Sequence, residues 1–451
     1  MPFGRLQPIA IRNRSPRPVF TLRNSALMRI VFASLGSLGD LHPLLALARA
    51  AAERGHVPVI AASSGYRGYV EGLGFEFRPI RPDLAFEPEL VGRLFHPQRG
   101  PERLMCEQIF PSVRETYTDL VAAATGADLL VVGELLYVAP LVAASVGIPW
   151  ANAILAPTSF LSASDPCILA PVPALYGLRR LGKWPYRLVF ALGRRVTGRW
   201  SAPLSALRRE LGLPVGANPV FDAKHSPLLT LALFPAFLAA PQQDWPARVT
   251  QTGFLFFAQR VRPDVTARLE HFFEKGEAPI VFTLGSSVIE IARDFFHTAA
   301  DTAQRLGRRA ILLTGRNAVP PGLPDSVLAI DYAPLDRVLP RAAVVVHQGG
   351  VGTCAEALRW GVPSVVIPFG YDQPDNAERL RRLGVAEVLP KPRFSGSRLQ
   401  ATLERVLASE PMRARARDLA AEIRPETDLE RSLDALENLV NAGQKPRMAW
   451  K

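Results

Sequence analysis

The sequence predicts an α/β protein built from two doubly wound domains, each a parallel sheet with helices on both faces. Its 451 residues exceed what one domain usually holds, because domains average about 100–200 residues and the length suggests two or three. Two separate blocks of the chain alternate short apolar runs with helical stretches. In both blocks the apolar runs are continuous, which is typical of strands buried on both faces of a parallel sheet.

The first block begins at Met28 and contains five runs with the length of strands. Helical patterns lie between some of these runs. The first helix is expected to begin at Pro43, because proline is favoured at the first helical position. The predicted strands are 30–34, Val57–Ala62, 75–80, 129–133 and 150–155, and the predicted helices are 43–55 and 66–73.

The alternation pauses between about 157 and 234, where prolines and aromatic residues gather. Next to this stretch, residues 135–164 carry no charge over 30 positions, which is longer than the roughly 20 residues that span a bilayer. Pro140, Gly147 and Pro149 interrupt the run. Breaks at this spacing favour a helix, a turn and a buried strand over a membrane span.

The second block begins at Pro279, and its predicted strands are 280–284, Ala310–Leu313, 327–331, 343–346 and 365–368. The last helices, over about 398–442, are amphipathic and include no further strand. The predicted organisation is a disordered tail over 1–27, an N-terminal domain over 28–240, a linker over 241–278, a C-terminal domain over 279–420, and a C-terminal helix and tail over 421–451 that can pack back on the N-terminal domain.

The chain carries a net charge of +12 from 53 basic and 41 acidic residues, and 47 of the basic residues are Arg. These Arg residues are scattered along helices, as on a solvated surface, and no basic module with interleaved aromatic residues appears. Nucleic-acid binding is therefore not expected. Five of the Arg residues lie in the first 27 positions, so the rest of the chain carries +7. A nucleotide, lipid or membrane-surface partner fits this charge better.

The three cysteines, Cys106, Cys167 and Cys354, are far apart and form no C-x-x-C pair. This pattern argues against both a disulfide framework and a thiolate metal site. The apolar stretches of residues 1–27 are too short for a secretory signal peptide. We therefore expect a cytoplasmic protein with reduced thiols, whose tail is disordered or precedes a natural start at Met28.

A glycine-containing loop, G-S-L-G-D-L-H-P over 36–43, connects the first predicted strand to the first helix. In two such domains, ligands bind between the carboxyl ends of the sheets, where this loop lies. Its glycines do not match the G-x-G-x-x-G spacing of a dinucleotide site. Asp40 and His42 are the titratable groups, and either can act as a general base. Asp40 can equally cap the helix, since aspartate is a preferred N-cap residue; the residues alone leave both interpretations open.

A second loop, H-Q-G-G-V-G-T-C-A-E over 347–356, follows a strand and opens a helix. Its three glycines allow close approach of the backbone to a ligand, and free N–H groups at a helix N-terminus attract an anion. The predicted donors to a phosphate are His347 and Thr353, and Glu356 can accept from a ribose hydroxyl. The glycines concerned are Gly349, Gly350 and Gly352.

Two further loops lead from strands into the predicted cleft. Asp372 and Gln373 follow the strand 365–368, and an adjacent acid and amide suit several hydrogen bonds to sugar hydroxyls. The alternative is an ordinary helix cap. Ser286 follows the strand 280–284 in a Gly-Ser turn that can donate to a diphosphate, although this turn alone is unspecific.

Together these loops resemble the GT-B glycosyltransferases, specifically the nucleotide-sugar-dependent family that acts on plant secondary metabolites, sterols, macrolides and glycopeptides. The signature H-x-G-x-x-x-T-x-x-E-A-x-x-x-G-V-P followed by D-Q carries the resemblance, which extends over about 28–440. It implies two Rossmann-like domains facing across a cleft. The C-terminal domain would bind the nucleotide sugar as a co-substrate, with no further cofactor, and the N-terminal domain would bind the acceptor.

The resemblance also assigns roles to single residues. His347, Gly352 and Thr353 would contact the donor phosphates, and Glu356 the ribose, while Asp372 and Gln373 would hold sugar hydroxyls. Tyr332 falls where the family has a tryptophan and would stack on the base, but Leu335 replaces the usual glutamine, which puts a polar base contact in doubt. Asp40 falls where many relatives have a catalytic histidine and some branches an aspartate. Asp40 is therefore the predicted base, and His42, on the acceptor side, the predicted structural residue.

Several shorter motifs resemble the rhamnosyltransferase catalytic chain of rhamnolipid synthesis. They are F-P-A-F at 234–237, P-Q-Q-D-W-P at 241–246, T-G-F at 252–254, and D-N-A-E-R-L at 375–380. That chain uses dTDP-L-rhamnose and a hydroxyalkanoyloxyalkanoate lipid. The alternatives are a UDP-glucose-dependent glucosyltransferase acting on a sterol, a flavonoid or another hydrophobic alcohol, a nucleotide-sugar 2-epimerase on the same fold, and a non-catalytic homologue that activates a partner.

The expected reaction is inverting transfer without a metal, because the chain contains no D-x-D pair to hold Mg²⁺. The acceptor region is expected over 157–234, with Trp184 on the acceptor side. Residues 176–200 contain no acid and seven basic residues, which alternate with apolar ones. The basic residues are Arg179, Arg180, Lys183, Arg187, Arg194, Arg195 and Arg199. Such a stretch can lie on an anionic membrane, meet a lipid acceptor, or simply cover an apolar pocket.

Overall fold

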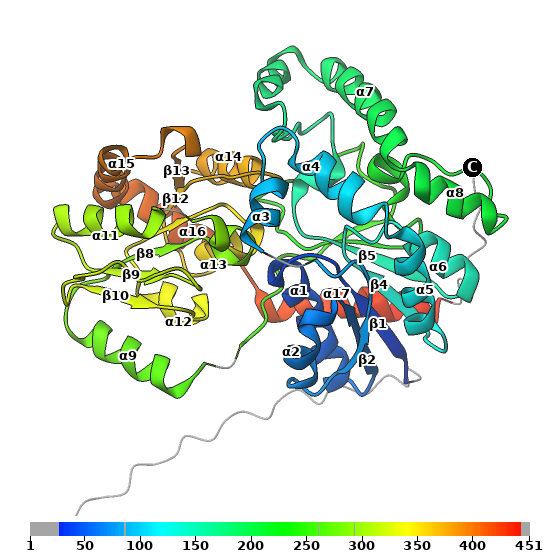
Figure 1. Ribbon diagram of the computed structural model, residues 1–451, viewed down its shortest axis with the longest axis horizontal. Coiled ribbons are helices and arrows are strands. Elements are labelled where there is room, and N and C mark those ends of the chain that lie inside the picture. The colour runs from blue at the N-terminus through cyan, green and yellow to red at the C-terminus, as the bar shows by residue number, and fades with distance from the viewer. Residues whose placement is uncertain (1–26, 85–86, 260, 293, 443–451) are drawn as a thin grey trace, which may run out of the picture.

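The fold consists of two parallel sheets, each the centre of one domain (Figure 1). The computed structural model describes residues 27–84, 87–259, 261–292 and 294–442. The N-terminal sheet has seven strands in the order β3-β2-β1-β4-β5-β6-β7, and the C-terminal sheet has six in the order β10-β9-β8-β11-β12-β13. The strand bounds are β1 Arg29–Ala33, β2 Val57–Ala62, β3 Glu76–Pro79, β4 Leu129–Val132, β5 Trp150–Ile154, β6 Thr230–Ala232, β7 Val249–Gln251, β8 Ile280–Thr283, β9 Ala310–Leu313, β10 Val327–Ile330, β11 Val344–His347, β12 Ser364–Val366 and β13 Ala386–Val388.

The predicted fold class is confirmed, with helices on both faces of each sheet. Buried side chains on one face of the N-terminal sheet pack with α5 and α6, and those on the other with α1 and α17. The helices before the domain crossover are α1 Leu38–Glu53, α2 Arg67–Glu71, α3 Pro88–Leu94, α4 Gly100–Arg103, α5 Val113–Ala124, α6 Ala139–Val146, α7 Trp184–Trp200 and α8 Ala202–Glu210. Those after it are α9 Pro263–Glu274, α10 Gly285–Val288, α11 Phe295–Arg305, α12 Leu335–Val338, α13 Val351–Arg359, α14 Gln373–Arg382, α15 Gly396–Ala408, α16 Glu410–Glu422 and α17 Pro425–Asn441.

The prediction that the first helix begins at Pro43 is wrong. Helix α1 begins at Leu38, and Pro43 lies inside it. Ser37 is the N-cap and forms a capping box with Asp40, which satisfies orphan N–H groups at the start of the helix. Proline there removes a single i→i−4 bond close to the helix start, and the capping box outweighs that loss.

The segment 241–278, expected as a linker, contributes to both domains. Strand β7 pairs in parallel with β6 at the edge of the N-terminal sheet, and α9 packs through Val265 and Leu269 on the C-terminal sheet. Strands β6, β7 and β13 were not predicted, and each has three residues. Helix α17 returns to the N-terminal domain, where Leu433, Leu436 and Leu439 pack in the same cluster as α1 (Figure 1).

The uncharged run 135–164 forms α6, β5 and a short helical turn at Pro157–Phe160, as expected from its prolines and glycines. Strand β5 is buried along its whole length. Within the described part of the chain, no helix has the length and apolar character needed to cross a membrane.

Candidate functional site

The strand orders place the candidate site at the switch point of each sheet. The order reverses between β1 and β4 in one sheet and between β8 and β11 in the other. Ligands of open α/β sheets bind at such points, outside the carboxyl ends of the strands. Each of these four strands leads to one candidate residue: β1 to Asp40 in the first turn of α1, β4 to Glu134, β8 to Ser286 in α10, and β11 to His347 at its own last position.

Asp40 lies in the first turn of α1, three residues after the N-cap Ser37. Its Oδ2 accepts hydrogen bonds from the Ser37 amide at 2.8 Å and the Ser37 hydroxyl at 3.0 Å. Gly36 has a φ of +124°, and a Cβ there would lie 2.5 Å from Asp40 Oδ2. Only glycine at position 36 therefore leaves room for this carboxylate. Asp40 contributes to the capping box from position N3 of the helix, and the N-cap is Ser37.

Three carboxylates, those of Asp40, Glu134 and Asp372, interact electrostatically although they come from different parts of the chain. Burial and, to a smaller extent, the charge of Glu134 raise the pKa of Asp40 to about 6, against the lowering effect of the Ser37 hydrogen bonds. Burial likewise raises the pKa of Asp372 to about 7, and both Glu134 and Asp40 add to that shift. The acids of the N-terminal domain, Asp40 and Glu134, and Asp372 of the C-terminal domain therefore lie within electrostatic range of each other.

Glu134 was not predicted from the sequence. It follows β4 directly after Gly133 and accepts hydrogen bonds from the Leu155 amide at 3.3 Å and from the Ser159 hydroxyl. The sequence did contain a signal for Glu134. A charged residue follows a strand that is buried along its whole length, and this strand pairs with the strand that leads to Asp40.

His42 also lies in α1, where its ring packs between the aromatic rings of Tyr69 and Phe257. Its Nε2 is 3.2 Å from the Tyr69 hydroxyl, and its ring stacks on Phe257 at 5.6 Å. Burial lowers its pKa to about 4, so the ring is neutral at pH 7. This packing is consistent with the structural role that the sequence predicts.

His347 ends β11 and is fully buried. Its Nδ1 accepts a hydrogen bond from the Gly349 amide at 3.1 Å, and burial lowers its pKa to about 3. A neutral ring that accepts at Nδ1 carries its proton on Nε2. Among the described residues, that Nε2 has no hydrogen-bond partner. The ring therefore holds an unused donor at the loop where a phosphate is expected.

Glycine is required at positions 349 and 350 for different structural reasons, and position 352 is open. Gly349 has a φ of +89°, and a Cβ there would lie 2.8 Å from Val366 Cγ1. Gly350 is the N-cap of α13, where a Cβ would lie 2.7 Å from Gln348 Nε2. Gly352 is exposed with nothing within 4 Å of such a Cβ. Gly352 therefore leaves the surface open at the start of α13, and the N-terminus of a helix suits an anion.

Thr353 and Glu356 follow in the first two turns of α13. Thr353 is buried. Glu356 Oε2 accepts from Trp360 Nε1 at 3.0 Å, and Arg359 lies 3.8 Å from the same oxygen. Burial nevertheless raises the pKa of Glu356 to about 7. Its other carboxylate oxygen remains available for a hydroxyl group.

Asp372 is the N-cap of α14 but makes no capping hydrogen bond. Its Oδ2 instead accepts from Asn376 Nδ2 at 2.7 Å, and the same Nδ2 donates to the Gly349 carbonyl at 3.0 Å. Asn376 thereby joins the two donor-side loops. Gln373 is buried, and its Oε1 accepts from the amides of Phe369 and Gly370. Among the described residues, no hydrogen bond is made by the Gln373 amide nitrogen, which is the group of this side chain that could meet a ligand.

Ser286 lies in α10, which follows β8, and Tyr332 follows β10; strand β9 separates these two strands in the C-terminal sheet. Ser286 is exposed beside Gly285, where a Cβ would lie 2.3 Å from Gln348 Nε2. The Tyr332 hydroxyl hydrogen-bonds to Gln259 Oε1, while 48% of the residue remains exposed. An aromatic side chain with that exposure can stack on a base.

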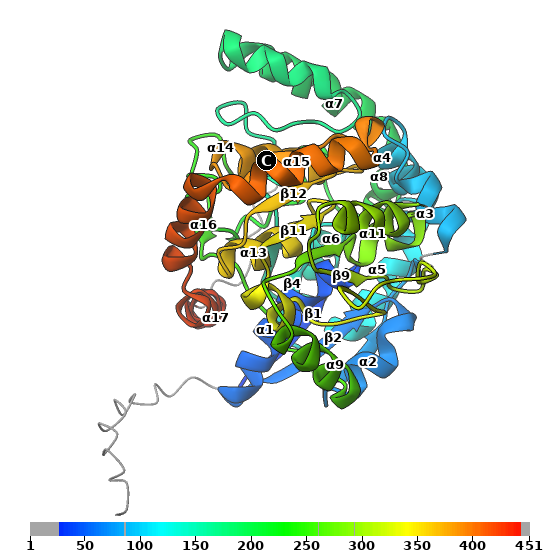
Figure 2. The same ribbon diagram turned by 90° about the vertical axis from the view of Figure 1, so that its left-hand side faces the viewer.

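Trp184 is not brought to this cluster. It begins α7, which projects from the N-terminal domain well away from α1 in both views (Figures 1 and 2), and it is 62% exposed. The loop between β5 and α7 is the part of the predicted acceptor region that reaches the other domain.

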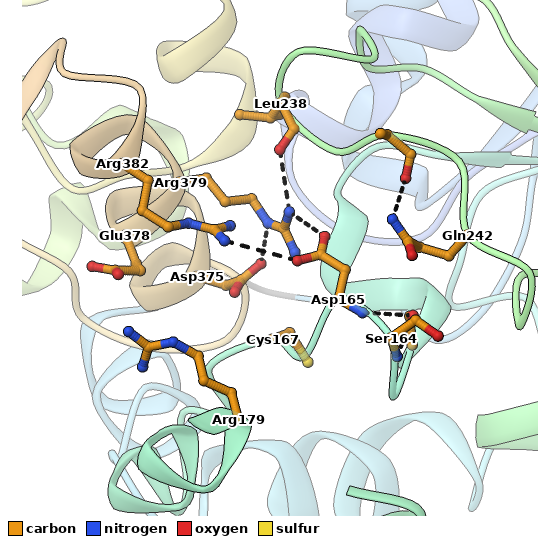
Figure 3. Close-up of polar contacts among 12 residues, drawn as sticks. Ser164, Asp165, Cys167, Arg179, Leu238, Gln242, Asp375, Glu378, Arg379 and Arg382 are labelled. Atoms are coloured by element: carbon orange, nitrogen blue, oxygen red, sulfur yellow. Dashed lines mark hydrogen bonds and ion pairs between the residues drawn. The ribbon is translucent and has the colours of Figure 1, made fainter. Parts of the chain in front are cut away.

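A buried ion-pair cluster joins that loop to α14 (Figure 3). Arg379, 2% exposed in its side chain, bonds through Nε to Asp375 at 2.7 Å and through Nη1 to Asp165 at 2.7 Å. Its Nη1 also donates to the Leu238 carbonyl at 3.1 Å. Asp375 in turn accepts from the Thr158 hydroxyl at 3.0 Å. The helix that begins at the sugar-binding candidates is thus fixed to the acceptor domain.

Tyr371 makes a second interdomain contact immediately before Asp372. Its φ of +57° is unusual for a residue with a side chain. The hydroxyl donates to the Leu94 carbonyl at 2.8 Å, and the ring packs edge-to-face on Phe95 at 4.9 Å. Contacts on both sides of Asp372 therefore hold its loop against the N-terminal domain.

Comparison with known proteins relates this geometry to a reaction. Residues 311–430 match the family described as Erythromycin biosynthesis protein CIII-like, C-terminal domain. The chain is 32% identical over 91% of its length to the O-mycaminosyltylonolide 6-deoxyallosyltransferase of Streptomyces fradiae, of which it covers 97%. It is 30% identical to glycosyltransferase GtfC of Amycolatopsis orientalis, over 88% of this chain and 94% of that protein.

Solved structures support the same fold. The spinosyn rhamnosyltransferase SpnG in complex with thymidine diphosphate superposes with a TM-score of 0.64 and 19% identity, over 90% of this chain and all of that one. The glycosyltransferase of kitacinnamycin superposes with a TM-score of 0.67 and 24% identity, over 92% and 99% of the two chains. The chain belongs to the GT-B family of nucleotide-sugar glycosyltransferases, and its residues 311–430 form an EryCIII-like C-terminal domain.

Proposed function

We propose that this glycosyltransferase moves a deoxyhexose, preferably L-rhamnose from dTDP-L-rhamnose, to the hydroxyl group of a hydrophobic acceptor with inversion at the anomeric carbon. The observation that carries this proposal is the position of Asp40. Its carboxylate lies in the first turn of α1 in the N-terminal domain, within electrostatic range of Asp372 in the C-terminal domain. A base between an acceptor and a donor sugar is what inverting transfer requires.

In the proposed step, the acceptor oxygen attacks the anomeric carbon while Asp40 takes the hydroxyl proton. The bond between the anomeric carbon and the diphosphate oxygen breaks, and its electron pair leaves with the nucleoside diphosphate. An aliphatic hydroxyl is a weak nucleophile, and general-base assistance contributes typically 10²–10⁴-fold to such steps. A pKa of about 6 makes Asp40 a stronger base than an ordinary aspartate, yet leaves it ionised at pH 7.

The leaving diphosphate needs stabilisation of its developing charge. The N-terminus of α13, the Nε2–H group of His347 and the hydroxyl of Ser286 would supply fixed donors. We propose that these groups suffice without a metal. Within the described residues, no group of three or more His, Cys, Asp and Glu side chains is arranged to hold an ion. Loss of activity on chelation, restored by Mg²⁺, would contradict metal independence.

The donor proposal draws on the relatives. A 6-deoxyallosyl transferase is 32% identical to this chain, and a rhamnosyltransferase of the same fold binds thymidine diphosphate. A deoxyhexose carried by dTDP is therefore preferred over UDP-glucose. A sterol 3-beta-glucosyltransferase of Aspergillus clavatus, 26% identical over 91% of this chain and 29% of that protein, supports UDP-glucose as the alternative. Because the chain is a glycosyltransferase, the 2-epimerase alternative is abandoned.

For the acceptor, we propose a hydroxyalkanoyloxyalkanoate lipid, on the resemblance of the motifs around 234–254 and 375–380 to the rhamnolipid enzyme. A macrolide-type acceptor is the second candidate, favoured by the tylonolide named for the 32% identical relative. Both are hydrophobic alcohols. A protein that handles either would work in the cytoplasm, and a lipid acceptor fits peripheral contact with a membrane.

The test is turnover by the purified protein with dTDP-L-rhamnose and UDP-glucose, each offered to a hydroxyalkanoyloxyalkanoate, a macrolide aglycone, a sterol and a flavonoid. We expect transfer from the dTDP sugar to the lipid, and loss of transfer in Asp40→Asn. The Asp294→Asn variant, which also changes an aspartate at a helix start, is the matched control. Turnover with UDP-glucose alone would contradict the donor proposal, and full activity of Asp40→Asn would remove Asp40 as the base.

A further inference from the structure

Helix α7, together with the helical turns at Pro173–Leu181, forms an arm on the N-terminal domain (Figures 1 and 2). One side of the arm is anchored by apolar packing. Tyr186 and Phe190 are buried in a small cluster with Ala163, and Phe221 packs against it. Gly193 lets that ring approach, since a Cβ there would lie 2.6 Å from Phe221 Cζ. The inner face of α7 is therefore fully explained by the fold.

The outer face carries large apolar side chains without a partner in the fold. Along α7 they recur every four residues, which places them along one side of a helix. The exposed fractions are 62% for Trp184, 60% for Leu188, 64% for Leu192 and 44% for Val196, and Leu181 just before the helix is 61% exposed. An exposed apolar row of this kind marks an interaction site on a protein surface.

The same face carries basic residues and no acid. Arg194 pairs with Asp222 at 2.8 Å and Arg179 lies over the Tyr176 ring at 3.9 Å. Five basic residues of the arm make no side-chain hydrogen bond or ion pair with any described residue. They are Arg180, Lys183, Arg187, Arg195 and Arg199. On a helix with 100° per residue, Arg195 and Arg199 fall among the exposed apolar positions.

This combination selects one kind of partner. A second copy of this face would bring Arg against Arg, which costs free energy because like charges repel. An anionic bilayer offers phosphate groups to the basic side chains and an acyl boundary to Trp and Leu. Long basic side chains place their charge at the headgroups while their stems remain in apolar surroundings. The chemistry of the face therefore matches an anionic lipid surface.

We infer that the outer face of the α7 arm docks the enzyme in the plane of an anionic membrane surface. The side chains of Leu188 and Leu192 enter the interface between headgroups and acyl chains, and Arg195 and Arg199 lie among lipid phosphates. The inference depends on the exposed face of this arm alone. It therefore stands or falls separately from the proposed donor and acceptor.

The first test is cosedimentation of the full chain with vesicles of phosphatidylcholine, with and without phosphatidylglycerol. We expect binding to the anionic vesicles that weakens with salt. Each basic side chain near such a surface contributes about 1 kcal/mol, which is roughly a fivefold change in the partition constant. The Arg195→Gln/Arg199→Gln variant should bind about 25-fold more weakly, whereas Arg316→Gln/Arg405→Gln, two changes in the other domain, should bind as the wild type does.

The second test removes the apolar contribution. Leu188→Gln/Leu192→Gln should lose binding to anionic vesicles, whereas the matched control Val215→Gln, at a position 88% exposed outside the arm, should retain it. Circular dichroism checks that each variant is folded. The inference is overturned if the wild type does not bind the anionic vesicles, or if both arm variants bind them as strongly as the wild type does. So does a concentration-dependent dimer in light scattering that Leu188→Gln/Leu192→Gln abolishes, because the face would then bind a second copy.

Discussion

The buried ion-pair cluster on α14 predicts a large loss of stability from a change of a few atoms. In Asp375→Asn, the shape of the side chain is kept and its charge is removed. The Asp375 side chain is 1% exposed and that of Arg379 is 2% exposed. Arg379 would then keep Asp165 and the Leu238 carbonyl as partners. The substitution therefore leaves a buried cation with half of its compensating charge.

Breaking a buried ion pair by removing one partner costs about 3–5 kcal/mol. Because Asp165 remains 2.7 Å from Arg379, we expect the lower end, about 3 kcal/mol. For a domain of roughly 200 residues, each kcal/mol lowers the melting temperature by about 2–4 °C, so the expected decrease is about 6–12 °C. The matched control is Arg381→Gln on the same helix, which breaks a pair with Glu378 at an arginine that is 52% exposed. Exposed pairs contribute about 0–1 kcal/mol.

The assay is thermal unfolding of both variants together with hydrogen exchange of the loop between β5 and α7. The Ile168 amide donates to Asp375 Oδ1 at 2.9 Å, so its exchange reports directly on this contact. We expect faster exchange around Ile168 in Asp375→Asn and wild-type exchange in Arg381→Gln. Equal melting temperatures of the two variants, with unchanged exchange at Ile168, would refute the assignment of the cluster as the interdomain contact.

Four further outcomes follow from the site. Asp40→Asn should lower kcat by about 10²–10⁴-fold, the usual contribution of a general base, while nucleotide affinity measured by calorimetry stays unchanged; weaker nucleotide binding would assign it a different role. Glu134→Gln removes a charge that raises the pKa of Asp40, so the acid limb of the kcat/KM profile should move to lower pH; an unmoved limb would contradict their coupling. Gly36→Ala should abolish activity because its Cβ would lie 2.5 Å from Asp40 Oδ2, and Gly65→Ala, with nothing within 4 Å, is the control that should remain active. EDTA should leave the rate unchanged, as an assay with and without added Mg²⁺ will show.

The sequence predicts those strands whose own residues form an apolar run, and it misses those that depend on pairing with a neighbouring strand. Strands such as β4 and β11 are continuous apolar runs, and a run of this kind is legible without any knowledge of contacts. Strand β13 has three residues, Ala-Glu-Val, and is a strand only because Ser364–Val366 pairs with it. Its existence depends on a neighbour that periodicity does not reveal.

The site divides in the same way. His347 and Asp372 lie in loops whose order along the chain already indicates a ligand, and the structure places both beside the switch points. Glu134 was missed because a single acid after a strand carries no motif. The ion pair between Arg379 and Asp165 joins residues 214 positions apart, and no local pattern predicts such a contact.

The raised pKa of Asp40 has a consequence for the chemistry that is proposed for it. An unperturbed aspartate, with a pKa of 3.8, is a weak acceptor of a proton from an alcohol. At a pKa of about 6, the carboxylate has nearly the proton affinity of an ordinary histidine, about 6.5, and about 90% of it is still ionised at pH 7. Burial and the negative charge of Glu134 produce that shift. An aspartate at this position can therefore act as a base nearly as strong as an ordinary histidine, provided that its surroundings stay dry and negative.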